Sequence, residues 1–201
     1  MDPEGAARWD AYADEFDRQP DHGLTDPVVR EAWRSLLRSL LPPPPATVVD
    51  LGCGTGSLSC LLAGDGFEVE GVDFSEEMLA KARAKADRLG VRATFRRGDA
   101  ADPPGRGPFD VVLVRHVLWV LPDPEVALDR WVSLLGPGGR LVLVEGRWDT
   151  GAGLSGTWTE AAVRRRTDSV RFRRLDDPAL WGGPITDERY AVVGETAGAG
   201  A

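Results

Sequence analysis

Residues 47–56 read Thr-Val-Val-Asp-Leu-Gly-Cys-Gly-Thr-Gly, an apolar run that ends in an acid and continues into three glycines at alternate positions. We interpret the run as a β-strand, the glycines as a tight loop and the residues from Ser57 onward as a helix. A backbone without Cβ atoms can turn sharply there and can approach a ligand closely. Because the first turn of a helix also offers unpaired N–H groups, the stretch predicts a site for a bulky nucleotide-like cofactor.

The glycine spacing separates this loop from a dinucleotide-binding loop. A dinucleotide fingerprint requires glycine at position 57, where this chain has Ser57. The pattern is instead an acid, Asp50, followed by glycines at positions 52, 54 and 56. A chance cluster of glycines stays open at this point, because glycine-rich turns also follow strands in dehydrogenases and other α/β folds.

Two later apolar segments also end in acids. Residues 68–75 predict a second strand that ends at Asp73, close to where an α/β nucleotide site places its ribose-binding acid. Residues 93–100 predict a third strand that ends at Asp99. Any one of these acids could be only a helix cap or a turn residue. Three strands that all end in acids favour a cofactor site along one edge of a sheet.

The rest of the chain alternates between apolar runs and helical patterns. Such alternation predicts an α/β fold with a mostly parallel sheet and helices on both of its faces. We expect strands near 46–51, 68–72, 92–96, 109–114, 140–145, 170–175 and 190–193. We expect helices near 57–64, 75–89, 124–134 and 157–167.

Two further helices are expected before this core. Residues 6–18 carry apolar side chains at i, i+3, i+4 and i+7, which predict one buried helix face: Trp9, Tyr12, Ala13 and Phe16. Residues 20–23 should break this helix, and Asp26-Pro27 should open a second one with an N-cap and a proline at the first helical position. The proline run 42–45 should form a stiff extended connector to the sheet.

Composition places the chain among ordinary globular proteins. It has 201 residues, which fits one domain, with 42% hydrophobic and 28% charged residues. The net charge of −8 argues against a general nucleic-acid surface. No run approaches the roughly 18 apolar residues of a membrane span. The acidic start, residues 1–4, lacks an apolar signal core, so we expect a cytoplasmic protein without a membrane partner.

The cysteines and histidines make no metal-site spacing. Cys53 lies in the glycine loop and Cys60 in the helix after it, beyond disulfide reach of each other, so we expect free thiols and no metal. Six arginines gather between positions 164 and 174. They either form a solvated surface of mixed charge or recognise an acidic substrate or partner.

Taken together, the motifs resemble class I S-adenosylmethionine (SAM) dependent methyltransferases. The loop at 50–56 resembles their cofactor loop, residues 109–118 their fourth-strand motif, and residues 135–141 their turn into the fifth strand. Residues 9–13 resemble the N-terminal helix that folds over the cofactor in small-molecule members. The resemblance implies a Rossmann-like, seven-stranded sheet whose last strand is an antiparallel insertion. It divides the single domain into a helical lid and connector at 1–45, a SAM-binding core at 46–146, a substrate-side part at 147–195 and a flexible tail at 196–201.

The resemblance also implies cofactor roles, with SAM as cofactor and S-adenosylhomocysteine (SAH) as product. Asp73 would accept hydrogen bonds from the ribose hydroxyls and Asp99 from the adenine amino group. Tyr12 would reach the SAM carboxylate, and Arg115 would contact SAM through its main chain. The remaining implied contacts are Asp50, Gly52, Cys53, Gly54, Gly56, Phe74, Met78 and Ala100.

The expected reaction is methyl transfer to an oxygen or nitrogen atom of a small-molecule acceptor. Arg115-His116-Val117 stands where enzymes that methylate nucleobase or glutamine amino groups carry an Asn/Asp-Pro-Pro-Tyr/Phe motif. His116 and His22 fall in the two segments expected to border the methyl group, so either could orient or deprotonate the acceptor. A purely structural role for each histidine stays open. Four tryptophans could line an apolar acceptor pocket: Trp119, Trp148, Trp158 and Trp181.

Two other functions stay open. An NAD(P)-dependent oxidoreductase would need a different glycine spacing and a hydride-transfer constellation such as Tyr-x-x-x-Lys, which we do not find in the sequence. A non-catalytic protein of the same fold would keep the cofactor acids and bind a partner through its arginine cluster. The sequence makes no prediction of the oligomeric state.

Overall fold

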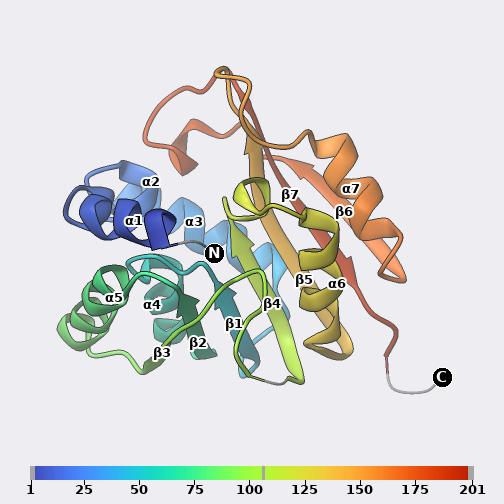
Figure 1. Ribbon diagram of the computed structural model, residues 1–201, viewed down its shortest axis with the longest axis horizontal. Helices are drawn as coiled ribbons and strands as arrows, with labels where there is room; N and C mark the ends of the chain where they lie inside the picture. Colours follow the sequence, from blue (N-terminus) through green and yellow to red (C-terminus); the bar gives the residue numbers. More distant parts are fainter. Residues whose placement is uncertain (1–2, 106, 199–201) are drawn as a thin grey trace.

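The computed structural model describes residues 3–105 and 107–198 and builds them around one seven-stranded sheet (Figure 1). The strands are β1 (Thr47–Leu51), β2 (Glu68–Asp73), β3 (Ala93–Arg97), β4 (Phe109–Arg115), β5 (Leu135–Arg147), β6 (Ser169–Arg174) and β7 (Glu188–Glu195). Their order in the sheet is β3-β2-β1-β4-β5-β7-β6. Strands β1 to β5 are parallel, and β7 runs antiparallel to both β5 and β6. The predicted sheet, with its antiparallel strand inserted between the fifth and sixth, is confirmed.

Helices cover both faces of this sheet. They are α3 (Pro27–Leu40), α4 (Ser57–Gly64), α5 (Glu76–Leu89), α6 (Pro124–Ser133) and α7 (Gly156–Arg164). Successive strand residues point to opposite faces. Accordingly Val48 belongs to a core that includes residues of α3 and α4, whereas Val49 belongs to a second core that includes residues of α6 and α7. Within the described ranges, no helix combines the length and apolar character that a bilayer span requires.

Strand β7 extends two residues beyond its prediction at each end, and β5 differs more. β5 begins at Leu135 rather than near position 140, because Phe109 pairs with Leu135 ahead of a register shift, and regular pairing resumes at Val111 and Arg140. The glycines predicted as a tight turn therefore lie inside the strand as an irregularity, with Gly138 at φ +72°.

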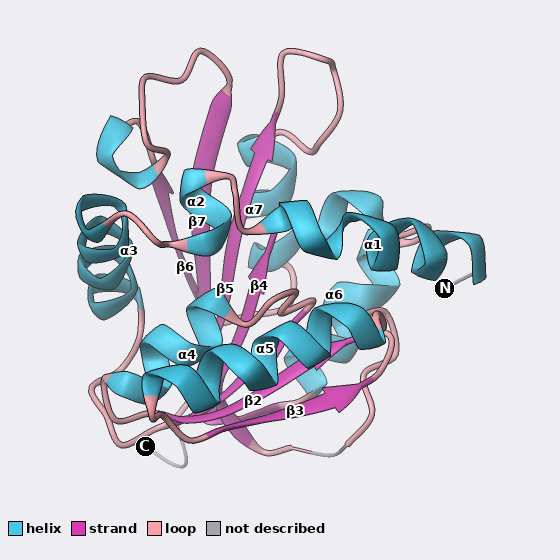
Figure 2. Ribbon diagram, turned by 90° about the vertical axis from the view of Figure 1, so that its left-hand side faces the viewer, coloured by secondary structure: helices cyan, strands magenta, loops and turns pink. Residues whose placement is uncertain are grey.

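The N-terminal segment lies beside the carboxyl ends of the parallel strands. Helix α1 (Pro3–Phe16) packs against α5, and Figures 1 and 2 both show it above that helix. Residues 20–23, predicted as a break, form a helical turn of their own, α2, because Pro20 at its first position already has a helical φ. The helix ends at Leu24, which is left-handed with φ +50°.

Helix α3 connects this segment to the other end of the chain. Asp26 caps it by accepting a hydrogen bond from the Val28 N–H at 2.7 Å, as predicted. Its apolar stripe is buried, and the Trp33 indole donates to the Leu180 carbonyl at 2.7 Å.

The sheet reverses its winding between β1 and β4, since β2 and β3 lie on one side of β1 and β4 and β5 on the other. Loops that leave neighbouring strands in opposite directions open a crevice at the carboxyl ends of those strands. The glycine loop after β1 and the segment after β4 both begin at this crevice.

Candidate active site

A cavity of about 430 Å³ occupies this crevice. One end is formed by residues from the end of β1, the loop after it, the end of β2, helix α5 and the loop after β3. These residues are Asp50, Gly52, Cys53, Gly54, Thr55, Asp73, Phe74, Met78 and Ala100. The N-terminal helix contributes Trp9, Tyr12 and Phe16. The other end is formed by Asp21, His22, Arg115, His116, Trp119, Trp148 and Arg189. All the predicted catalytic and cofactor residues except Gly56 and Asp99 therefore line one cavity. A larger groove of about 710 Å³, between α3 and β6, contains none of them.

The glycine loop needs glycines for two different reasons. Gly52 and Gly54 have φ values of +72° and +54°, and the Phe16 ring of α1 lies 3.4 Å from the position that a Cβ of Gly54 would take. Gly56 is also left-handed, but a Cβ there would lie 2.8 Å from Ala82 and 3.0 Å from the Phe95 ring. Gly56 thus lets the loop pack under α5 and β3 and is not part of the cavity wall.

Asp50 and Asp73 place two carboxylates at the glycine-loop end. Asp50 accepts a hydrogen bond from the Ser59 hydroxyl at 2.5 Å. Burial raises the pKa of Asp50 to about 6, although this hydrogen bond and the charge of Arg115 both act to lower it. Asp73 accepts from the Gly54 N–H at 2.8 Å and the Ser75 N–H at 2.9 Å, and burial raises its pKa against these bonds. Each carboxylate oxygen has a second lone pair, so Asp73 can still accept from a ligand hydroxyl.

Asp99 does not line the cavity, although its neighbour Ala100 does. Its Oδ1 accepts a hydrogen bond from the Ala101 N–H at 2.9 Å, which stabilises the turn after β3. The adenine contact implied for Asp99 stays a prediction.

Helix α1 is held over the glycine loop by a stripe of acids that sequence reasoning missed. Asp10 accepts from the Ser75 hydroxyl at 2.5 Å, and Asp14 pairs with Lys81 at 2.6 Å. Asp17 accepts from the Thr55 hydroxyl at 2.5 Å and pairs with the buried Lys85 ammonium at 2.9 Å. Asp10 and Asp14 lie at i and i+4 on one face of α1, and Asp17 follows directly after the helix ends at Phe16. That spacing was visible in the sequence, but the partners come from α5 and the glycine loop.

Arg115 fastens α2 to the end of β4. Its guanidinium donates to the Asp21 carbonyl at 2.7 Å and pairs with the Asp21 carboxylate at 2.6 Å. It also lies 4.3 Å above the Trp33 ring. The resemblance gave Arg115 only a main-chain contact, whereas the structure gives its side chain a role of its own. Asp21 was not predicted, since nothing in its local sequence marks it.

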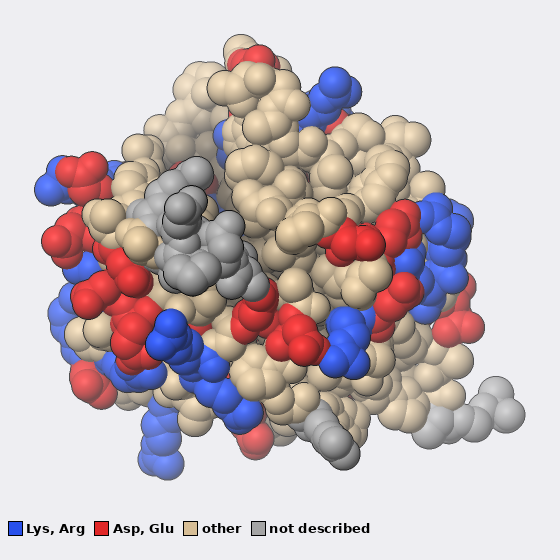
Figure 3. Space-filling model, in the orientation of Figure 1, with Lys and Arg blue, Asp and Glu red and all other residues tan. Residues whose placement is uncertain are grey.

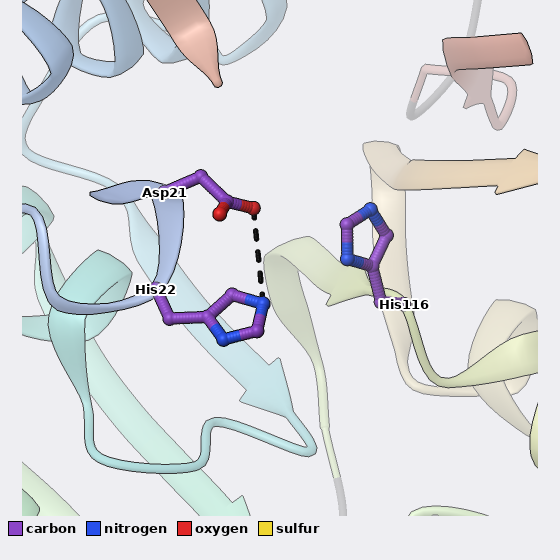
Figure 4. A group of neighbouring side chains, drawn as sticks. All are labelled: Asp21, His22 and His116. Carbon is purple, nitrogen blue, oxygen red and sulfur yellow. Dashed lines mark ion pairs between the residues drawn. The ribbon is translucent and has the colours of Figure 1, made fainter. Parts of the chain in front are cut away.

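The two histidines face each other across the cavity (Figure 4). His116 has a left-handed backbone with φ +57°, and its ring meets Trp148 edge-on at 5.3 Å. His22 stacks on Phe16 at 4.3 Å, with its Nε2 3.8 Å from Asp21 Oδ2. Burial, with Arg115 and Arg189, holds the pKa of His116 well below its usual range. Burial and Arg115 also lower the pKa of His22, so both rings are neutral at pH 7.

Donor atoms of Asp21, His22 and His116 lie within 4.8 Å of one another, which is a spacing that a metal ion could use. The surroundings do not suit a cation, because Asp21 is already paired with Arg115. Metal-bound histidines also usually donate their second ring nitrogen to a carboxylate or carbonyl. In the part of the chain that the structure describes, His116 Nε2 is buried without a hydrogen-bond partner. The cluster therefore fits a neutral hydrogen-bonding site better than a metal centre.

Of the four predicted tryptophans, Trp119 and Trp148 line the cavity. The Trp119 indole donates to the His116 carbonyl at 3.0 Å. Trp181 lies behind the wall, nearly parallel to the His116 ring at 6.1 Å, and Trp158 packs against the core. Arg189, which was not predicted, reaches the cavity from β7 and lies 4.6 Å from the Trp181 ring.

The arginine cluster at 164–174 is largely neutralised by its own surroundings. Arg164 pairs with Glu160, Arg165 with Glu125, Arg166 with Glu125 and Asp129, and Arg174 with Asp176. Figure 3 shows acidic and basic side chains interleaved over the side of the molecule that carries α6 and α7. These pairs support the interpretation as a solvated surface of mixed charge.

Comparisons with known proteins agree with this geometry. Residues 48–139 match a family model described as a methyltransferase domain. A demethylmenaquinone methyltransferase from Thermus thermophilus is 40% identical over 117 residues, which are 56% of this chain and 53% of that protein. A ubiquinone biosynthesis O-methyltransferase from Azorhizobium caulinodans is 32% identical over 157 residues, 71% of this chain and 62% of that protein. The chain thus spans about half the length of the curated relatives it matches.

A solved structure with bound SAM also resembles this chain. Magnesium protoporphyrin IX methyltransferase from Synechocystis PCC 6803 matches it with a TM-score of 0.65 at 26% identity. The match covers 86% of this chain and 77% of that one.

Proposed function

Because the chain belongs to the class I SAM-dependent methyltransferases, we propose that its cavity binds SAM and directs the methyl group to an oxygen atom of a small-molecule acceptor. One observation carries the proposal. The glycine loop, two buried carboxylates and two neutral histidines all line the same cavity of about 430 Å³. The glycine-loop end suits the cofactor, and the histidine end suits the acceptor.

At the glycine-loop end the residues fit SAM by charge and by shape. Asp50 and Asp73 provide negative charge for a cationic cofactor, and Asp73 has lone pairs left for vicinal hydroxyls. Phe74 and Met78 give this end an apolar surface that suits an adenine ring. Gly54 leaves the space that a side chain would fill.

The histidine end favours a hydroxyl acceptor over an amine. Arg115 and Arg189 both line it, and their charges contribute to the low pKa of His116. The same charges disfavour an ammonium group and stabilise an oxygen that develops negative charge. The flat faces of Trp119 and Trp148 offer this acceptor an apolar surface.

When bound, SAM supplies an activated methyl group, so the chain has to position the acceptor and exclude water. A neutral imidazole can accept the proton of an acceptor hydroxyl in a hydrogen bond, and His116 and His22 both offer such a ring. A positioned base contributes roughly 10²–10⁴-fold to rate. Trp9, Tyr12 and Phe16 of α1 line the cavity, and their apolar rings would limit the access of water to bound SAM.

The experiment is a two-stage assay on the whole chain. Calorimetry with SAH, NADH and NADPH tests the cofactor first, and we expect binding of SAH alone. Transfer from SAM with a deuterated methyl group is then followed by mass spectrometry in matched sets of hydroxylated and amine-bearing metabolites. Binding of NADPH without SAH would overturn the proposal, and labelled amines without labelled hydroxyl compounds would overturn the oxygen assignment. SAH binding with no labelled product from either set would favour a non-catalytic protein of this fold.

A further inference from the structure

The backbone of His116 is held in a conformation that its side chain does not favour. Its φ of +57° is uncommon for a residue other than glycine, and the surrounding structure has to maintain it. Strand β5 supplies the hydrogen bonds on both sides of this residue. The His116 N–H donates to the Val144 carbonyl at 2.9 Å, and the next two N–H groups donate to the side chain of Glu145.

Glu145 lies at the carboxyl end of β5 and is fully buried. Its Oε1 accepts from the Val117 N–H at 3.0 Å and from the Leu118 N–H at 2.8 Å. Leu118 begins a short 3-10 helix, η1 (Leu118–Val120), so the carboxyl group caps the start of that helix. It does not line the cavity and so cannot touch the acceptor itself.

The same cap supports the cofactor loop. The Val117 side chain fills the space where a Cβ of Gly52 would lie, so the segment after β4 packs directly against the glycine loop. The Trp119 indole, one turn later, bonds back to the His116 carbonyl. Glu145 therefore supports the point where the acceptor end and the cofactor end of the cavity meet.

We propose that Glu145 is a positioning residue. By holding Val117 and Leu118, it keeps the His116 backbone left-handed and directs the imidazole into the acceptor end of the cavity. The consequence for turnover rests on the proposed function, whereas the consequence for the position of His116 does not.

The role requires an accepting oxygen rather than a negative charge. Burial raises the pKa of Glu145 to about 8 against its two N–H bonds, so the group is a neutral acid at pH 7. Its Oε2 is buried with no hydrogen-bond partner among the residues that the structure describes. Tyr190, its ladder partner on β7, is an ionisable side chain on the same face of the sheet, and Arg147 and Glu188, two positions away on the same two strands, share that face. The carbonyl oxygen of a glutamine can accept the same two bonds.

The test compares Glu145→Gln with Glu145→Leu in the whole chain without added ligand. NMR follows the amides of Val117 and Leu118 and the ring protons of His116. We expect Glu145→Gln to keep all three sets of resonances and Glu145→Leu to shift them. Thr159→Val is the matched control, since Thr159 is equally buried and bonds to Tyr190, the ladder partner of Glu145, so the change perturbs the same face of the sheet without removing the oxygen that Val117 and Leu118 bond to. Should Glu145→Leu not fold, Glu145→Asp replaces it, because its shorter side chain withdraws the oxygen from both N–H groups.

Turnover provides the second measurement once an acceptor is known. We expect the kcat of Glu145→Leu or Glu145→Asp to fall by about tenfold or more, while Glu145→Gln and Thr159→Val keep the rate of the wild type. The proposal is overturned if His116 keeps its resonances in the variants that lack the oxygen, or if Thr159→Val moves them equally. Because the NMR measurement needs no ligand, absence of SAH binding or of methyl transfer would overturn the proposed function and leave this result unchanged.

Discussion

Arg115 Nη2 lies 2.6 Å from Asp21 Oδ2, and this pair joins the end of β4 to the helical turn that carries His22. Both side chains are nearly buried, with 10% and 14% of their surfaces exposed. The pair therefore fixes one histidine of the acceptor end relative to the strand that carries the other.

Removal of Asp21 should destabilise the fold. Asp21→Ala leaves the Arg115 guanidinium buried without its counter-charge, and we expect a loss of about 3 kcal/mol in the free energy of unfolding, measured with urea. The control is Asp176→Ala, whose pair with Arg174 is more than half exposed and should change stability by less than about 1 kcal/mol. Equal losses in the two variants would contradict the importance assigned to the buried pair.

Removal of the Asp73 carboxylate should weaken cofactor binding. We expect Asp73→Ala to lose roughly 1.5–3 kcal/mol of SAH binding free energy in calorimetry, the scale of a charge-assisted hydrogen bond. Asp110→Ala serves as the control, because Asp110 bonds to Thr47 at the amino ends of β4 and β1, away from the cavity at their carboxyl ends. Gly54→Val should bind still less, since its side chain would enter the space under Phe16. Normal SAH affinity in either site variant would refute the assignment of this end of the cavity.

Removal of the acidic stripe on α1 should open the lid. The triple variant Asp10→Asn/Asp14→Asn/Asp17→Asn loses its pairs with Lys81 and Lys85, so we expect faster hydrogen exchange in α1 and weaker SAH binding. Glu15→Gln is the matched control, because Glu15 pairs with Arg18 just after the helix and both of these side chains are largely exposed. If the triple variant exchanges and binds like the wild type, the apolar face alone holds the lid.

Glu145 should make stability depend on pH. Its pKa is raised from 4.5 to about 8 in the folded protein, so its contribution is fully present below pH 4.5 and is lost as the pH rises through about 8. The difference between these two pKa values corresponds to about 5 kcal/mol of stability. We expect Glu145→Gln to gain stability relative to the wild type across this window, as measured by urea unfolding at pH 4.5 and pH 9. A constant difference between the two proteins would show that Glu145 does not titrate in this way.

His116 should affect turnover more than cofactor binding. His116→Asn is the informative change, because asparagine tolerates the left-handed backbone while it removes the ring. With a known acceptor we expect kcat to fall by roughly 10²-fold or more while SAH affinity stays unchanged. If His116 acts as a base, the wild type loses rate below its lowered pKa, on the acidic side of the usual histidine range, and the variant lacks this limb. If a His22→Ala/His116→Asn double variant transferred methyl groups at the wild-type rate, neither histidine would contribute to catalysis. The rate would then come from the positioning of acceptor and cofactor alone.

The sequence by itself determined the strands apart from the start of β5, the core helices, the glycine loop and the end of the sheet at which the cavity lies. These features follow from local causes, namely the apolar period of a strand or helix, the left-handed turns at Gly52 and Gly54, and the capping of α3 by Asp26. Each of these features depends on residues only a few positions apart, so one amino-acid sequence is enough to predict them.

Tertiary structure alone decided which side chains meet in the cavity and in what state. Arg115 and Asp21 are 94 positions apart, and the partners of the acids on α1 come from α5 and the glycine loop. The left-handed backbone of His116 depends on Glu145 of another strand, and the low pKa of its ring depends on burial by several elements. A local pattern cannot show these relationships, because charge pairing and desolvation depend on distance in space and on the packing of segments remote in the chain.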